Sequence, residues 1–129
     1  MSGFSKDVRS YRDLIVWQKA MDLVVESYRL SRLLPKAEVY GLASQMQRCA
    51  VSVPANIAEG QGRDHLGDYV RHLSIANGSL MELETHLLLA SRLAYLTNQD
   101  LDQAFALTAE VGRMLTGLSK KLRSLKPKT

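Results

Sequence analysis

The sequence is poor in several features, and each shortage excludes a class of protein. Cys49 is the only cysteine among 129 residues, so no disulfide can form within the chain, and a reducing compartment is the natural setting. The longest strongly apolar run, at residues 87–90, is far too short to cross a bilayer. The first seven residues contain no apolar signal core. We therefore expect a cytoplasmic protein that does not contact a membrane.

The rest of the composition is that of an ordinary globular domain. Hydrophobic residues make up 46% of the chain and charged residues 23%, which argues against disorder. A chain of this length can bury roughly two-thirds of the surface that it exposes when unfolded. It needs neither disulfides nor a metal ion to fold, and we expect a single domain that spans residues 1–129.

Apolar residues recur every three or four positions in four segments, a spacing that predicts amphipathic helices. The predicted helices cover roughly residues 13–34, 38–60, 64–95 and 98–125. The connections between them are short, which places successive helices side by side and antiparallel. No segment alternates like a strand. The predicted fold class is all-α, an antiparallel up-and-down four-helix bundle.

Turn and capping residues refine the helix ends. Thr97 with Asp100 resembles a capping box, and Asp64 is the expected N-cap of the third helix. Gly60 and Gly62 are expected to form a left-handed turn after the second helix. Pro54 lies inside that helix, where it removes one backbone hydrogen bond.

The first helix has two apolar stripes on nearly opposite sides. One contains Leu14, Trp17, Met21, Val24 and Tyr28, and the other contains Val16, Ala20, Leu23, Leu30 and Leu34. Only one stripe can face the core of a simple bundle, and an exposed apolar stripe usually marks an interface. We assign the second stripe to an oligomer contact. The alternative is a wide core face with some exposed aliphatic residues.

A line of polar residues follows one flank of the second helix. It contains Gln45, Ser52, Asn56 and Glu59, with Cys49 among them and Glu84 of the third helix as a candidate partner for Arg48 or Asn56. Buried polar groups must find partners, and a neighbouring helix can supply them. We interpret the line as a structural hydrogen-bond network, and the alternative is a polar cleft for a ligand.

Candidate catalytic and metal-binding patterns are weak. A di-iron bundle needs inward glutamates and a Glu-x-x-His pair, which this sequence lacks. The pairs Glu82 with His86 and Asp68 with His72 are interpreted as solvated surface pairs. Cys49 borders an apolar face, where an inert buried thiol is expected. We expect no enzyme activity, no cofactor and no metal.

Positive charge collects toward the end of the chain. The net charge is +4, and six basic residues without an acidic one follow Glu110. Basic residues can hold phosphates, although cations at the end of a last helix also complement its dipole. The candidate phosphate contacts are Arg48, Arg63, Arg71, Lys120, Lys121 and Arg123. Aromatic residues are only 6% of the chain, which disfavours base-specific readout.

Several motifs resemble those of the small four-helix bundle proteins encoded in 23S rRNA intervening sequences. They are DLIVWQKA at residues 13–20, AVSVPANIAEG at residues 50–60 and GSLMELET at residues 78–85. Cys49 and Asp64 depart from the family pattern. The resemblance implies a bundle that assembles into a ring, typically a homopentamer. It also implies kinship with accessory variability proteins of diversity-generating retroelements, which bind nucleic acid and associate with a reverse transcriptase.

Two functional hypotheses follow from these observations. In the first, a non-catalytic oligomer binds RNA or DNA, because a ring multiplies a modest basic patch and sums weak phosphate contacts. In the alternative, the protein is an interaction scaffold for a reverse transcriptase or a ribosome-associated protein. A small-molecule site along the Gln45–Glu59 flank is a third, weaker hypothesis.

Overall fold

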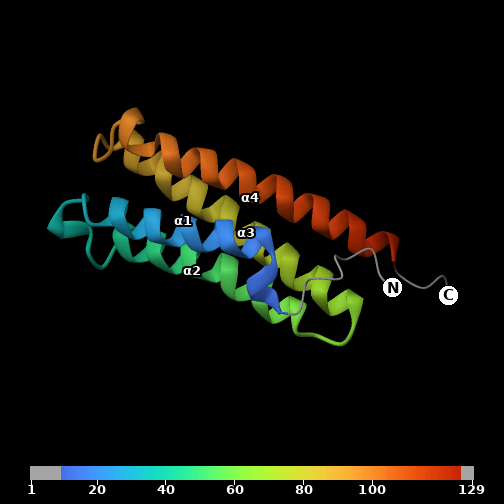
Figure 1. Ribbon diagram of the computed structural model, residues 1–129. Helices are drawn as coiled ribbons and strands as arrows, with labels where there is room; N and C mark the ends of the chain where they lie inside the picture. The colour runs from blue at the N-terminus through green and yellow to red at the C-terminus, as the bar shows by residue number, and fades with distance from the viewer. Residues whose placement is uncertain (1–9, 126–129) are drawn as a thin grey trace.

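The computed structural model describes residues 10–125, and four long helices dominate it (Figure 1). The helices are α1 (Ile15–Ser31), α2 (Leu42–Gln61), α3 (Leu66–Arg92) and α4 (Asn98–Ser124), with two short 3-10 helices, η1 (Tyr11–Asp13) and η2 (Lys36–Glu38). The described part of the chain contains no strand. The all-α prediction is confirmed.

The helices form an up-and-down bundle. In Figure 1 the chain reverses its direction at each connection, so that sequence neighbours run antiparallel. Each helix packs beside its neighbours in the sequence, and α1 also packs beside α4, whereas the backbones of the diagonal pairs α1–α3 and α2–α4 do not approach within 8 Å, measured between Cα atoms. The bundle therefore has one end with the α2–α3 turn and the end of α4, and an opposite end with the α1–α2 and α3–α4 connections.

The core of the bundle is built largely from apolar residues of α2, α3 and α4 that recur every three or four positions. The fully buried large side chains of these three helices are Met46, Val53, Ile57, Leu73, Leu83, Leu87, Leu101, Val111, Leu115 and Leu122. Each aliphatic side chain of this size contributes about 1.5–3 kcal/mol when it leaves water. The apolar spacing in the sequence thus located three of the four core faces.

On α1 the assignment of the two stripes was wrong. Val16, Ala20, Leu23, Leu30 and Leu34 are all buried within the subunit core, so they cannot form an oligomer contact without unpacking it. Of the other stripe, Leu14 is buried, while Met21 is 41% exposed and Trp17 only partly covered. Both stripes have the same spacing, and only the positions of α2 and α4 decide which one is covered.

Helix α1 is shorter than predicted, and α2 begins later in the chain than predicted. Residues 13–34 were expected in the first helix, but η1 precedes it and the chain leaves it at Ser31. The second helix was expected from residue 38, but Glu38 belongs to η2 and α2 begins only at Leu42. The Glu38 carboxylate accepts a hydrogen bond from the Leu42 backbone N–H at 3.0 Å, which satisfies an otherwise free amide of the first turn of α2.

The end of α3 has the left-handed residue that was expected elsewhere. Gly62 has φ −81°, and no described glycine has a positive φ, so the left-handed turn predicted at Gly60 and Gly62 was wrong. Ala94 has φ 61° instead. The Tyr95 N–H donates to the Ala90 carbonyl and the Ala94 N–H to that of Ser91, both at 2.9 Å, which is a Schellman motif. It ends α3 at Arg92 rather than at residue 95.

The two predicted N-caps have different outcomes. The capping box of α4 is confirmed, because the Asp100 N–H donates to Thr97 Oγ1 at 3.1 Å and the Thr97 N–H donates to Asp100 Oδ2 at 2.9 Å. Asp64 does not cap α3. The N-cap residue is His65, and its side chain makes no capping hydrogen bond.

Candidate functional site

A polar seam joins α2 to α3. It consists of Ser52, Asn56 and Glu59 on α2 and His72 and Ser79 on α3. Ser52 Oγ lies 2.7 Å from Ser79 Oγ, and Asn56 Nδ2 donates to the Ser52 carbonyl at 2.9 Å. Asn56 Oδ1 lies 3.1 Å from His72 Nδ1. The Ser52–Ser79 and Asn56–His72 contacts therefore link α2 to α3 through polar side chains.

The close approach of α2 to α3 depends on Gly60. A Cβ atom at this position would lie 2.8 Å from the Cβ of His72 and 3.2 Å from the Tyr69 carbonyl oxygen. This contact brings the His72 ring into the seam, where its side chain is only 6% exposed. His72 was expected to form a solvated pair with Asp68, and that prediction was wrong because the ring turns inward to Asn56.

Two residues assigned to the network lie outside it. Gln45 is exposed on α2. Glu84 lines a groove between α3 and α4, on the other side of α3, so it contacts neither Arg48 nor Asn56. The prediction that Glu84 partners either residue was wrong. Glu84 follows the buried core residue Leu83, and one step along a helix turns the side chain by about 100° around the axis, here toward α4.

A second cluster lies on the same helix pair. Cys49 of α2 faces Glu82 and His86 of α3, and one ligand atom from each lies within 4.8 Å of the other two. Cys49 is buried, as predicted. Burial, followed by the nearby charge of Glu82, raises the pKa of Cys49 to about 11. Without a bound metal ion, the thiol is therefore protonated near neutral pH.

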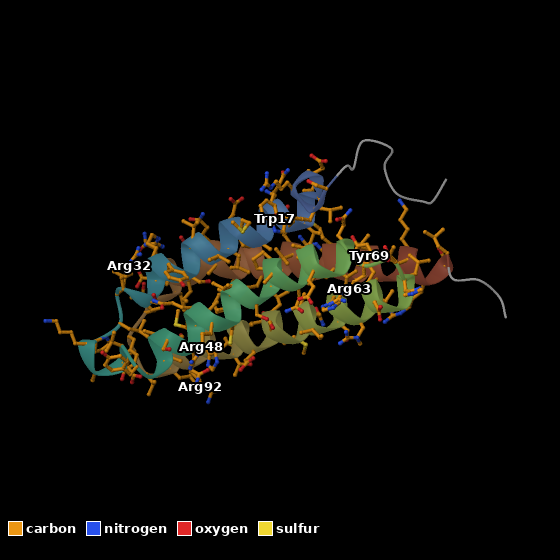
Figure 2. All side chains as sticks on the ribbon, turned by 90° about the horizontal axis from the view of Figure 1, so that it is seen from below. Trp17, Arg32, Arg48, Arg63, Tyr69 and Arg92 are labelled. Atoms are coloured by element: carbon orange, nitrogen blue, oxygen red, sulfur yellow. The ribbon has the colours of Figure 1, made fainter. Side chains whose placement is uncertain are left out.

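Five of the six candidate phosphate contacts lie toward one end of the bundle. We call Arg63, Arg71, Lys120, Lys121 and Arg123 the cationic end, because they come from the α2–α3 connection, the N-terminal part of α3 and the end of α4, which share one end of the bundle. All five are exposed. Arg48 lies apart from them: Figure 2 shows it in the half of the bundle that carries Arg92, whereas Arg63 lies near Tyr69. Lys126 and Lys128, which also belong to the basic tail, are outside the described residues.

The cationic end contains a small polar hollow. It encloses about 140 Å³ between α3 and α4. Arg123 lines it together with Ser74, Asn77, Thr116 and Ser119. A guanidinium surrounded by hydroxyl and amide groups offers several hydrogen-bond donors to an anionic oxygen.

One cation of this end is already engaged. Arg63 Nη2 contacts Glu59 Oε2 at 2.6 Å, so the last seam residue of α2 partly neutralises it. Both side chains are about half exposed, and such exposed pairs exchange readily with solvent. Arg63 can therefore move to a phosphate at small cost.

A larger groove lies midway along the α3–α4 face. It encloses about 530 Å³ and is bordered by Glu84 and Arg113. Gly112 and Gly117 on α4 leave it open, since they have no side chains to fill the space. Charged Glu84 and Arg113 line it together with apolar Leu80 and Met81. This mixture of charged and apolar walls does not point to one class of ligand.

The parts of the site that the sequence missed all cross between helices. Ser79 and His72 complete the seam, and Cys49 joins Glu82 and His86. The four-residue spacing of Glu82 and His86 was visible in the sequence. Nothing in the sequence showed that Cys49 lies opposite that pair.

Taken together, these features define a four-helix bundle protein with a polar seam and a cationic end. No helix among the described residues has both the length and the apolar content needed to cross a membrane. The family model described as 23S rRNA-intervening sequence protein matches residues 12–117, and the chain belongs to this family.

A solved structure supports the fold. It is a protein of unknown function from the S23 ribosomal protein family of Bacteroides thetaiotaomicron, with a TM-score of 0.77 and 24% sequence identity. The alignment covers 82% of this chain and 99% of that one. At this identity the likeness concerns the fold alone. No curated protein matches the chain significantly.

Proposed function

We propose that this protein is a non-catalytic, oligomeric bundle that binds the phosphate backbone of RNA or DNA through its cationic end. The observation that carries the proposal is the gathering at one end of the bundle of Arg63 from the α2–α3 connection, Arg71 from α3, and Lys120, Lys121 and Arg123 from α4. Complementing the dipole of α4 accounts only for cations in its last turn. It does not account for Arg63 in the α2–α3 connection or for Arg71 in the second turn of α3.

The charge balance favours the α4 side of this end. Residues 111–125 contain no acidic residue. Asp64 and Asp68 lie at the start of α3 and weaken the positive field near Arg71. The strongest phosphate contacts are therefore expected at Lys120, Lys121 and Arg123, with Arg123 already placed in a polar hollow.

Self-association would bring several copies of the cationic end into one particle. Exposed apolar side chains could form the contact between subunits. Most of the exposed large apolar side chains lie on α3 and on the α1–α2 connection: Leu33, Val39, Tyr40, Ile75, Met81, Leu88, Leu89 and Leu93. The α1–α2 connection and the C-terminal end of α3 share the end opposite the cationic end, so all of these residues except Ile75 and Met81 lie there. We propose that these residues replace the buried α1 stripe as the contact in a homo-oligomer, with the homopentamer implied by the family resemblance as the expected form. A closed ring would sum weak phosphate contacts into useful avidity.

Fluorescence anisotropy with a labelled RNA hairpin and a labelled duplex DNA tests binding. The variant K120Q/K121Q/R123Q should lose about tenfold or more in affinity at low salt, because three phosphate contacts disappear. The matched control is R32Q/K36Q/R92Q, which removes three exposed cations from the opposite end. Because these residues border the proposed oligomer contact, light scattering must show that the control keeps the oligomeric state of the wild type. Equal losses in both variants would show that only net charge matters, and no binding by the wild type at low salt would rule the proposal out.

The alternative is a scaffold for a protein partner such as a reverse transcriptase or a ribosome-associated protein. Tyr40, which is 94% exposed, and its apolar neighbours favour a protein contact as much as self-association. Light scattering separates the two. A monomer in solution, together with a nuclease-resistant complex that forms with such a partner, would favour the scaffold.

A further inference from the structure

Cys49, Glu82 and His86 bring a thiol, a carboxylate and an imidazole together across the α2–α3 interface. We propose that these three side chains bind a divalent transition-metal ion, with Zn²⁺ as the best match. Their ligand atoms all lie within 4.8 Å of one another, and no other such group of three occurs among the described residues. The inference does not depend on nucleic-acid binding.

The helix geometry gives two of the ligands a fixed relation. Glu82 and His86 are four residues apart on α3 and so project from one face. Glu82 Oε2 lies 4.0 Å from His86 Nε2. Zinc takes sulfur at about 2.3 Å and nitrogen or oxygen at about 2.0–2.2 Å, so ligand atoms around a tetrahedral ion lie roughly 3.5 Å apart. The ligand atoms, all within 4.8 Å of one another, must therefore approach by little more than an ångström at most, and the exposed Glu82 side chain has room to move.

The buried, unpaired imidazole of His86 also supports a metal ion at this place. Both ring nitrogens are buried, and neither has a hydrogen-bond partner within the described part of the chain. The Glu82 carboxylate is too distant to serve as one. Buried polar nitrogens in folded proteins are nearly always paired. A metal ion would supply a partner to Nε2, the ring nitrogen that lies 4.0 Å from Glu82 Oε2.

The donor set selects the class of metal. A thiolate prefers zinc and other soft or borderline ions over Mg²⁺ and Ca²⁺, which take oxygen ligands. Thiolate and carboxylate together carry two negative charges, which balance a divalent cation. The exposed guanidinium of Arg48, next to Cys49 in the sequence, repels a bound cation and so lowers the affinity of the site for the metal ion. When sulfur binds the ion, the thiol proton leaves to the solvent.

The coordination would be incomplete with these residues alone. Three protein ligands leave the fourth position of a tetrahedral ion to water or to another molecule. Glu82 is 58% exposed at its side chain, so the open position faces the solvent beside α3. The site would thus present the metal at the surface of the α2–α3 face rather than enclose it.

Cobalt substitution tests the proposal on the full chain without an affinity tag. Titration with Co²⁺ should give one ion per chain, a near-ultraviolet band from sulfur-to-cobalt charge transfer, and visible bands typical of four-coordinate cobalt. Zn²⁺ should displace the cobalt. Absence of the charge-transfer band would overturn the assignment, because the thiolate is then not a ligand.

Variants locate the ion. C49A and H86Q should each weaken Zn²⁺ binding by more than about 100-fold, since even lost outer-shell partners cost roughly 10- to 100-fold. The matched controls are H65Q and E84Q, which change an exposed histidine and an exposed glutamate outside the cluster. Circular dichroism checks that each variant is folded. Wild-type affinity in folded C49A, or an equal loss in H65Q, would show that the ion binds elsewhere on the surface.

Heat provides an independent readout. Zn²⁺ should raise the unfolding temperature of the wild type, because it binds only the folded arrangement of the three ligands. The same addition should leave the unfolding temperature of C49A unchanged. A rise of equal size in both proteins would contradict the site.

Discussion

The phenol of Tyr95 donates a 2.9 Å hydrogen bond to Oε2 of Glu38, 57 residues earlier in the chain. The other oxygen of this carboxylate caps α2 by accepting the N–H of Leu42 at 3.0 Å. One side chain therefore joins the α1–α2 connection to the α3–α4 connection. The bond from Leu42, and then the bond from Tyr95, hold the pKa of Glu38 below its usual value.

The first prediction concerns acid. A carboxyl whose pKa is lowered by folding stabilises the protein above its unfolded pKa, about 4.3, and this stabilisation is lost as pH falls through the lower folded value. The pKa of Asp100 is also lowered, chiefly by the Thr97 backbone, so it adds to the same loss. We expect stability to decline below about pH 4.3 and E38Q to flatten part of that decline. Urea unfolding at several pH values measures it. E84Q is the control, and an unchanged slope in E38Q would contradict the role of Glu38.

The second prediction concerns the end of α3. Ala94 holds a left-handed backbone conformation that costs an L-residue about 1–2 kcal/mol. We expect A94G to raise the free energy of unfolding by about 1 kcal/mol, because glycine adopts this conformation without that cost. The control A106G, at an exposed position inside α4, should lower it by about 1 kcal/mol. Chemical denaturation gives both values, and a loss of stability in A94G would be inconsistent with the Schellman motif.

The third prediction concerns the α2–α3 contact. The added methyl group of G60A would meet the Cβ of His72 and the backbone of Tyr69, neither of which can turn aside. We expect a loss of about 1–3 kcal/mol, typical of overpacking. At Gly78, on the exposed face of α3, a Cβ would meet nothing within 4 Å. G78A should therefore gain about 1 kcal/mol from helix propensity. Thermal unfolding of the pair tests it, and equal changes would mean that the helices do not approach closely at Gly60.

The fourth prediction concerns the cationic end. Replacing Glu59 with glutamine frees Arg63 from its 2.6 Å partner and removes one negative charge. We expect E59Q to bind RNA more tightly and to steepen the salt dependence by about 0.7–0.9 in the slope of log K against log salt, the contribution of one phosphate contact. Anisotropy titrations between about 50 and 200 mM salt measure it. If E59Q binds like the wild type while K120Q/K121Q/R123Q binds weakly, Arg63 is not part of the contact.

The core of α3 could be predicted closely, whereas the core face of α1 could not. Tyr69, Leu73, Ala76, Leu80, Leu83 and Leu87 follow one unbroken helical repeat, and all are buried. No competing stripe existed on that helix. On α1 two apolar stripes had similar spacing, so either could have faced the core. Which one is buried depends on helices that are distant in the sequence. Val16 and Ala20 were therefore placed on the wrong side.

Local chemistry determined much of the rest. The capping box of Thr97 and Asp100 was correctly predicted because both partners lie within one turn. The left-handed residue was not, since glycine is the common choice there and the chain uses Ala94. Glu38 was also missed, because its cap on α2 and its bond to Tyr95 require the two connections to meet in space.

By itself, then, the sequence determined that the chain forms four amphipathic helices, where most of them lie and that positive charge accumulates late in the chain. These properties come from spacings within a turn or two, and such spacings act through local geometry. Only the tertiary structure decided which face of α1 is covered, which polar residues meet across α2 and α3, and that Cys49 faces Glu82 and His86. Those contacts depend on the rotation and register of whole helices, which are set by the packing of all four together.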